Sequence, residues 1–257
     1  MTTNLDVPSD GLSPTAPSSG PSRKVIPESP SVPAPLARLN ANVSFRDQAF
    51  EAIKQVIMDA DIYGGTDEIR LDERQLSDAL GVSRTPVREA MTRLEQKGLL
   101  RTVPRRGIFI VRKTKREIIE MIEMWAALES MAARIATINA SDEDIARLRH
   151  MFDEFNSTRP GEHLGEYSDA NIAFHQAIIR LSGSHLMGKA IENLFIHVRA
   201  IRRRTISQAN RANRSILEHM QIIDALEARN TELAERLVRE HSLGLAAHVE
   251  DFCDFLD

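Results

Sequence analysis

The chain has 257 residues, enough for two ordinary domains that each bury a core. With 42% hydrophobic and 27% charged residues it has the composition of a soluble protein, and no apolar run reaches the roughly 18 residues of a membrane span. The N-terminus lacks a basic segment followed by an apolar core, and a lone cysteine, Cys253, excludes an intramolecular disulfide. We therefore expect a cytoplasmic protein with no membrane partner.

The net charge of −4 is unevenly distributed along the chain. Residues 84–113 contain 9 Lys or Arg against 2 Asp or Glu, whereas residues 114–257 contain 17 against 23. A basic concentration within an otherwise acidic chain is typical of a surface that binds nucleic acid.

Composition and periodicity divide the chain into three parts. Residues 1–43 hold eight of the eleven prolines and little apolar periodicity, which predicts a disordered tail. Residues 44–113 have the pattern of three helices followed by two short β-rich runs. Helical periodicity dominates residues 114–257, so we expect about six helices there and no strands. The predicted fold class is mainly α.

The second part begins with a predicted helix over residues 44–60. Asp72 is placed to cap a second helix that ends at Gly81, a residue suited to a left-handed helix stop. Ser83 is then expected to cap a third helix, whose first turn includes Pro86 at little cost.

The third helix has one apolar stripe. Its members are expected to face the core: Val87, Met91 and Leu94. Arg84, Thr85 and Arg88 then lie together on the outward side of its N-terminal end. Arginine forks suit guanine edges or phosphate oxygens, and a recognition helix presents its N-terminal residues to the major groove. An ordinary solvated helix face is the alternative interpretation.

The segment after the third helix has the pattern of a β-hairpin. Residues 99–103 and 108–111 are β-rich, and the turn between them carries Arg105 and Arg106. Three helices followed by a basic hairpin form a winged helix-turn-helix, whose wing is placed to reach the DNA backbone or minor groove.

The stretch LDERQLSDALGVSRTPVREAMTRLEQKGLLRTVPRRGIFI resembles the DNA-binding domain of the GntR family of bacterial transcription regulators. The resemblance implies that residues 44–113 bind double-stranded DNA as a homodimer on a palindromic operator. It places the DNA contacts at six residues: Arg74, Arg84, Thr85, Arg88, Arg106 and Gly107.

Three histidines of the C-terminal part lie on apolar helix faces. His175 follows Asn171 by four residues in NIAFHQAII, and His219 and His241 sit on stripes of their own. One such histidine is usually a hydrogen-bonded core residue. Imidazoles on three helices favour a shared site, since helical bundles hold metals in this way. Spacing alone leaves both readings open.

The spacing of these residues resembles that of the FCD ligand-binding domain, found in the fatty-acid-regulator branch of the GntR family. The resemblance covers residues 114–257 and implies an all-helical effector-binding and dimerisation domain, with a divalent zinc, nickel or manganese ion and a small organic acid effector. The implied metal ligands are Asn171, His175, His219 and His241.

Two positions depart from the family pattern. Asn171 stands where metal-binding members have Asp, so the site would have less negative charge, and Asp169 is about 200° away around the helix. Trp125 stands where many relatives have an arginine, and we expect it to be core, with an apolar wall of the effector pocket as the alternative. One basic run offers positive charge in place of that arginine, but we expect most of it to form a solvated or interface face: Arg199, Arg202, Arg203 and Arg204.

The leading hypothesis is therefore an effector-responsive transcription regulator, a repressor of a metabolic operon. One alternative is a metal-dependent enzyme, because histidine-rich bundles also serve hydrolases and oxygenases. The other is a DNA-binding protein whose C-terminal bundle only dimerises, with the histidines as core. The sequence contains no nucleophile elbow, P-loop or glycine-rich dinucleotide loop, which speaks against the enzyme.

Overall fold

The computed structural model describes residues 44–153, 164–208 and 211–256, which all lie within one compact unit of residues 32–257. The tail predicted for residues 1–43 lies outside the described residues. No described helix is both long and apolar enough to cross a membrane.

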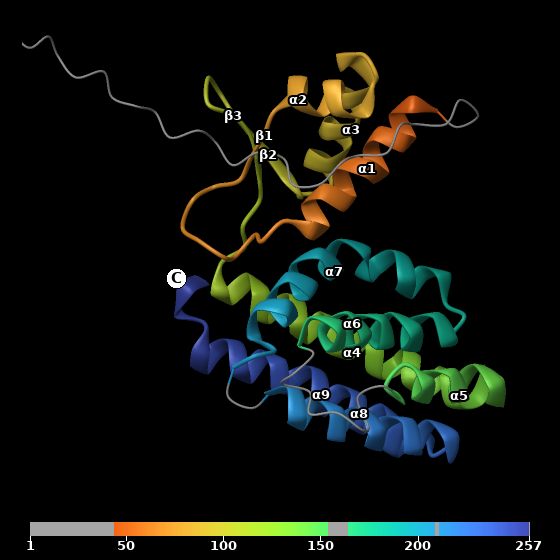
Figure 1. The fold of residues 1–257 in the computed structure, drawn as a ribbon. Helices are drawn as coiled ribbons and strands as arrows, with labels where there is room; N and C mark the ends of the chain where they lie inside the picture. The colour runs from red at the N-terminus through yellow and green to blue at the C-terminus, as the bar shows by residue number, and fades with distance from the viewer. Residues whose placement is uncertain (1–43, 154–163, 209–210, 257) are drawn as a thin grey trace, which may run out of the picture. The chain divides into compact units, whose positions relative to one another are not determined.

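Three helices and a small sheet make up the N-terminal part (Figure 1). Their bounds are α1 Phe45–Asp59, β1 Arg70–Leu71, α2 Glu73–Leu80, α3 Arg84–Gln96, β2 Leu100–Val103 and β3 Gly107–Ile110. The sheet is antiparallel with the order β1-β3-β2. The sequence predicts the hairpin of β2 and β3 but not β1, which pairs Arg70 with Phe109 and Leu71 with Ile108.

The turn between α2 and α3 follows from local residues. The Asp72 carboxylate accepts hydrogen bonds from the backbone N–H groups of Arg74 and Gln75, at 2.8 and 3.0 Å, and so caps α2. Gly81 ends α2 with a φ of 68°, a left-handed conformation that favours glycine. Ser83 is the N-cap residue of α3, but its side chain makes no capping hydrogen bond, so the prediction holds for its position alone.

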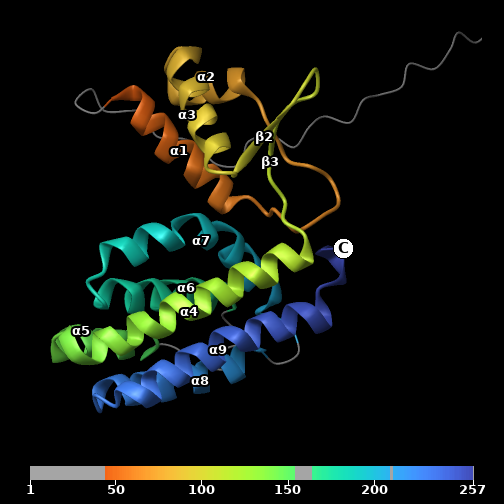
Figure 2. The ribbon, with the colours of Figure 1, turned by 180° about the vertical axis from the view of Figure 1, so that it is seen from behind.

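Six α-helices and a short 3₁₀-helix make up the described residues beyond 113, with no strand among them (Figures 1 and 2). Their bounds are α4 Lys115–Asn139, α5 Asp142–His150, α6 Leu164–Leu181, α7 His185–Thr205, α8 Arg211–Glu227, α9 Thr231–Phe252 and the 3₁₀-helix Asp254–Leu256. The six helices confirm the expected helical architecture.

Helix α4 is the central element of this bundle. A capping box fixes its start, because the Thr114 hydroxyl accepts from the Glu117 N–H while the Glu117 carboxylate accepts from the Thr114 N–H. It packs along α9 and also contacts α6 and α7 (Figure 2). Consequently the middle of α4 is enclosed on several sides, and Trp125 and Glu129 are both buried there.

Candidate functional sites: an arginine groove and a histidine cluster

The first turn of α3 is exposed because the apolar stripe of the helix anchors its other side. Val87, Met91 and Leu94 are at most 2% exposed. Arg84, Thr85 and Arg88 are all exposed, as expected from the helical spacing.

A groove of about 340 Å³ brings four of the predicted DNA-binding residues together. Those four residues are Arg74, Arg84, Arg88 and Gly107. The groove therefore joins α2, α3 and the base of the wing, as expected for one DNA-facing surface. Thr85 and Arg106 do not line it, although both are exposed.

Several of these arginines are held by carboxylates. Arg88 donates to Glu73 from Nη2 at 2.8 Å and from Nε at 3.3 Å. Arg106 is 3.4 Å from Glu68, and Arg74 is 3.8 Å from Asp78. Because these pairs are largely exposed, each is a weak interaction that a phosphate or a base edge can replace.

The groove also contains Arg70, which sequence reasoning missed. Gly107 has a φ of 119°, and a Cβ added there would lie 2.7 Å from Nε of Arg70. The backbone φ therefore requires glycine, and a side chain at this position would also displace the exposed Arg70 guanidinium. The signal for Arg70 was weak, since it lies in the two-residue strand β1 that was not predicted.

Three histidines from three helices form a second candidate site. His175 of α6, His219 of α8 and His241 of α9 each offer a ring nitrogen, and these atoms all lie within 4.8 Å of one another. Nε2 of His241 lies 3.2 Å from Nε2 of His219 and 3.3 Å from Nε2 of His175. All three side chains are buried. The structure therefore brings together the histidines singled out from the sequence.

Each Nδ1 atom of the cluster has a partner on the outside. Nδ1 of His175 lies 2.5 Å from the buried Glu129 carboxylate, and Nδ1 of His241 lies 2.6 Å from Glu218. Nδ1 of His219 lies 3.4 Å from the Tyr167 hydroxyl. An ionised carboxylate accepts only, so the Nδ1 atoms of His175 and His241 carry the proton. Their Nε2 lone pairs consequently face the centre of the cluster.

The electrostatics of the cluster favour neutral imidazoles. Burial lowers the pKa of His175 to about 3 and that of His219 well below its usual value. Burial also lowers the pKa of His241. Burial raises the pKa of Glu129, but its hydrogen bonds with His175 and Ser242 and the nearby Arg202 charge act in the opposite direction, and the net shift is downward. The result is a set of neutral ligands backed by ionised carboxylates.

The donor set suits a divalent metal ion. Neutral imidazoles oriented by outer carboxylates are a common arrangement around zinc and nickel. Asn171 adds an observation of its own: its Nδ2 donates to Ser215 at 3.1 Å, while its buried Oδ1 has no hydrogen-bond partner. An unpartnered buried oxygen agrees with the role predicted for Asn171 as a fourth ligand. Asp169 is exposed and His248 bonds Gln208 instead, so neither residue belongs to the cluster.

The basic run on α7 is only partly solvated. Arg203 and Arg204 are exposed, as expected, and Arg199 is half-buried against Asp59 and the Met58 carbonyl. Arg202 is the buried member of the run, at 4% exposed. It lies four residues after the buried Val198, so a helical repeat carries it into the bundle.

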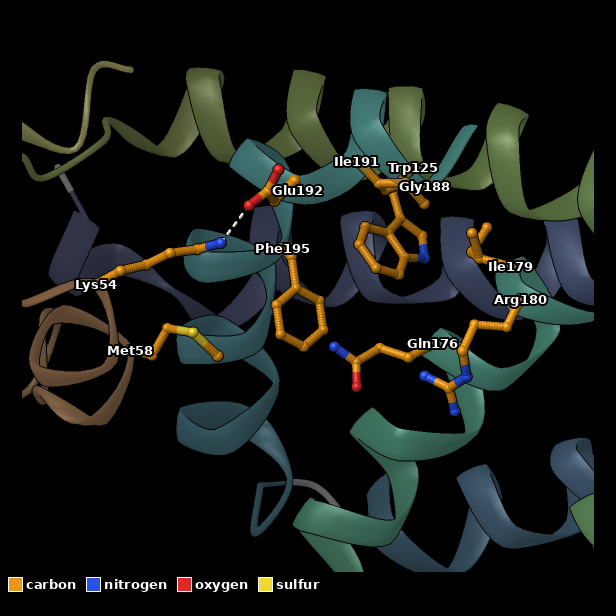
Figure 3. Close-up of a pocket in the computed structure, with 10 residues that line it drawn as sticks. All are labelled: Lys54, Met58, Trp125, Gln176, Ile179, Arg180, Gly188, Ile191, Glu192 and Phe195. Atoms are coloured by element: carbon orange, nitrogen blue, oxygen red, sulfur yellow. Dashed lines mark hydrogen bonds and ion pairs between the residues drawn. The ribbon is translucent and has the colours of Figure 1, made fainter. Parts of the chain in front are cut away.

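Trp125 contacts the cluster through Glu129 and also lines a separate pocket, which Figure 3 shows. Its indole N–H donates to Glu129 at 2.8 Å, and its ring stacks on Phe195 with the ring centroids 5.9 Å apart. Both rings line a pocket of about 260 Å³ that lies among α1, α4, α6 and α7. Lys54 reaches Glu192 across one end of this pocket. Trp125 is therefore core on one side and a pocket wall on the other.

Comparison with known proteins places these two sites in a family. Residues 45–110 match the model of the bacterial regulatory proteins of the gntR family, and residues 120–243 match the FCD domain. The chain is 27% identical over 198 residues to the uncharacterized HTH-type transcriptional regulator YdhC of Bacillus subtilis, covering 76% of this chain and 86% of that protein.

One further relative supports the same family, and one solved structure has the same fold. The HTH-type transcriptional repressor RspR of Escherichia coli is 24% identical over 204 residues, covering 79% of this chain and 88% of that protein. The solved structure of E. coli McbR/YncC matches this chain with a TM-score of 0.67 and 24% sequence identity. The match covers 82% of this chain and 100% of that one, so the two share a fold. Family and relatives are transcription regulators, not enzymes. The chain therefore belongs to the GntR family of DNA-binding transcription regulators and carries an FCD domain.

Proposed function

We propose that this chain is a homodimeric repressor of a metabolic operon, and that a small carboxylate effector controls its binding to a palindromic operator. Residues 44–113 form the DNA-binding domain, and residues 114–257 bind the effector and dimerise. The DNA contacts are those predicted from the sequence: Arg74, Arg84, Thr85, Arg88, Arg106 and Gly107. A role as repressor is supported by the name of one relative, the transcriptional repressor RspR.

The observation that carries the effector site is the convergence of the three Nε2 atoms. Nε2 of His175 lies 3.3 Å from Nε2 of His241, and because both rings carry their proton on Nδ1, the two Nε2 lone pairs repel one another unless a cation lies between them. Zinc, nickel or manganese bound by Asn171, His175, His219 and His241 would remove this repulsion. Bound there, the ion supplies a positive site that attracts an anionic effector.

The dimer is proposed on grounds of specificity. One winged helix contacts too few base pairs to select a site in a genome, whereas two copies related by a twofold axis read both halves of a palindrome. The helical C-terminal part is the proposed dimer contact. Analytical ultracentrifugation at micromolar concentration, with and without operator, tests it, and a monomer under both conditions contradicts it.

The metal site is tested by Asn171→Asp. The carboxylate adds a negative charge beside the ion, so zinc and nickel should bind more tightly than in the wild type, measured by calorimetric titration of metal-stripped protein. Asp169→Asn is the matched control. It exchanges the same two residue types in the reverse direction, removing one negative charge at an exposed position on the same helix. It should leave metal affinity unchanged.

His219→Ala separates the effector domain from DNA binding. We expect metal binding and effector response to be lost while operator affinity without effector stays near the wild-type value. If wild type binds no metal and His219→Ala still responds to effector, the histidines are polar core and the bundle serves dimerisation alone.

A further inference from the structure

Arg202 is a buried cation without a hydrogen-bond partner. Its side chain is 4% exposed, and none of its three nitrogens, Nε, Nη1 and Nη2, has a partner within the described part of the chain. A buried guanidinium left unpaired destabilises the fold, because it loses its water without gaining an anion. Arg202 remains charged at neutral pH, since burial lowers its pKa only to about 10.

The nearby carboxylates already have other partners. Glu129 accepts from His175 with one oxygen and from Trp125 and Ser242 with the other. Glu218 accepts from His241. Neither carboxylate therefore forms a hydrogen bond with Arg202, although the Glu129 charge acts on it.

A second buried arginine increases the excess of positive charge. Arg211 is 5% exposed. Burial, followed by the repulsion from the Arg202 charge, lowers the pKa of Arg211 to about 10. Two carboxylates, Glu129 and Glu218, balance these two guanidiniums. A divalent ion at the histidines would add two positive charges that these carboxylates do not compensate. A dianion would neutralise them.

A cavity lined by α8 and α9 lies beside the histidine cluster, and Arg202 is not among its lining residues. It has a volume of about 360 Å³, and its lining includes Arg211, Glu218 and His241. His241 belongs both to the histidine cluster and to the cavity wall, so the cavity extends to the cluster. The lining pairs two arginines, Arg211 and Arg214, with two acids, Glu218 and Asp251, so an entering anion meets two guanidiniums in a wall whose formal charges balance.

We propose that Arg202 binds one carboxylate of a dicarboxylate ligand, whose other carboxylate faces the histidine cluster. The guanidinium fork offers two parallel donors to a carboxylate, and burial makes that interaction strong. Arg211 lies on the entry path. This inference rests on the proposed function, because it identifies the small carboxylate effector proposed for the histidine cluster as a dicarboxylate.

The test is calorimetric titration of zinc-loaded protein with malonate, succinate and glutarate, beside acetate and uncharged malonamide. Zinc content is measured after each titration, because dicarboxylates also chelate the ion. Wild type should bind at least one dicarboxylate more tightly than acetate and should not bind malonamide. Arg202→Met should weaken that binding by about tenfold or more, and Arg202→Lys should weaken it less.

Thermal unfolding distinguishes an anion site from a structural role. Without dicarboxylate, Arg202→Met should melt no lower than wild type, because it removes an uncompensated buried charge. The dicarboxylate should raise the Tm of wild type and not that of Arg202→Met. The matched control is Arg203→Met, which removes an exposed arginine from the same helix and should behave as wild type.

Three results would overturn the inference: equal dicarboxylate binding by wild type and Arg202→Met, no preference of wild type for any dicarboxylate over acetate, or a lower Tm of Arg202→Met without ligand. Operator titrations keep the two proposals apart. If dicarboxylate binding depends on Arg202 but leaves operator affinity unchanged, the anion site stands and the proposed effector control fails.

Discussion

Glu73 at the start of α2 holds Arg88 of α3 by two hydrogen bonds, with Nη2 at 2.8 Å and Nε at 3.3 Å from the carboxylate oxygens. The same guanidinium lines the arginine groove. In the free protein the carboxylate thus orients the arginine in a defined direction, and it also competes with DNA for the same donors.

Replacing Arg88 and replacing Glu73 should change DNA affinity in opposite directions. Arg88→Ala should weaken operator binding by about 1–3 kcal/mol and relax specificity at one base position. Glu73→Gln should tighten binding to operator and random DNA alike, because it removes a negative charge from the DNA-facing surface. Fluorescence anisotropy at fixed salt measures both.

The control for Glu73→Gln is Glu89→Gln, which removes an exposed charge from α3 that forms no ion pair among the described residues. It should have the smaller effect. An unchanged operator affinity for Arg88→Ala would exclude α3 as the recognition helix.

The base of the wing should tolerate no side chain at Gly107. Gly107→Ala forces a φ of 119° on alanine and places its Cβ 2.7 Å from Nε of Arg70, so we expect a loss of about 1–3 kcal/mol in the free energy of unfolding. Gly98→Ala is the control, because Gly98 has a φ of 73° but open space around it. Urea unfolding should show the larger loss at Gly107, and equal losses would mean that the Arg70 contact is unimportant.

Removing the charge of Glu129 should loosen the metal site without touching a ligand. Glu129 orients His175 through Nδ1, so Glu129→Gln should lower zinc affinity by about 10–100-fold. Competition with a chromophoric chelator measures this, and circular dichroism checks the fold. Glu240→Gln, an exposed carboxylate on α9, should have no effect. Wild-type affinity in Glu129→Gln would contradict the proposed orienting role.

The buried histidines should make the metal-stripped protein sensitive to acid. Burial lowers the pKa of His175 from its ordinary 6.5 to about 3, so between these values the unfolded chain binds a proton that the folded chain does not. Stability should be full above pH 6.5 and fall as the pH decreases, by about 1.4 kcal/mol per pH unit for each such histidine.

Urea unfolding of metal-stripped protein from pH 7.5 to 5 measures this slope. Replacement of a cluster histidine, His219→Gln, should flatten it by about one histidine's contribution. The exposed control His185→Gln should leave the slope unchanged. A wild-type stability that does not vary over this range would contradict neutral, buried imidazoles.

The sequence predicted what helical periodicity and turn chemistry determine. Asp72 and Gly81 delimit α2 because one side chain satisfies free N–H groups and the other residue adopts a left-handed φ. The burial of His175, His219 and His241 followed from their place on apolar stripes. Their convergence followed from the resemblance to a known domain, because spacing cannot say which helix faces meet.

The interactions that periodicity does not encode were missed. Strand β1 has only two residues and is defined by its pairing with β3, so no local sequence pattern predicts it. Glu129 was overlooked although it follows Trp125 by one helical turn on a buried stripe, a position where an acid needs a partner. Most of the basic run was expected to be solvated or at an interface, but its residues alone did not show that Arg202 is the member that faces inward.

Trp125 is the only tryptophan in the chain, and its indole N–H donates to the carboxylate that also binds His175. Indole emission depends on the hydrogen bond and the field at the ring nitrogen, so the protein contains an intrinsic optical reporter two side chains away from the proposed ion. Filling or emptying the histidine cluster should therefore change the emission of this one residue. Ligand screening would then require no dye, label or DNA.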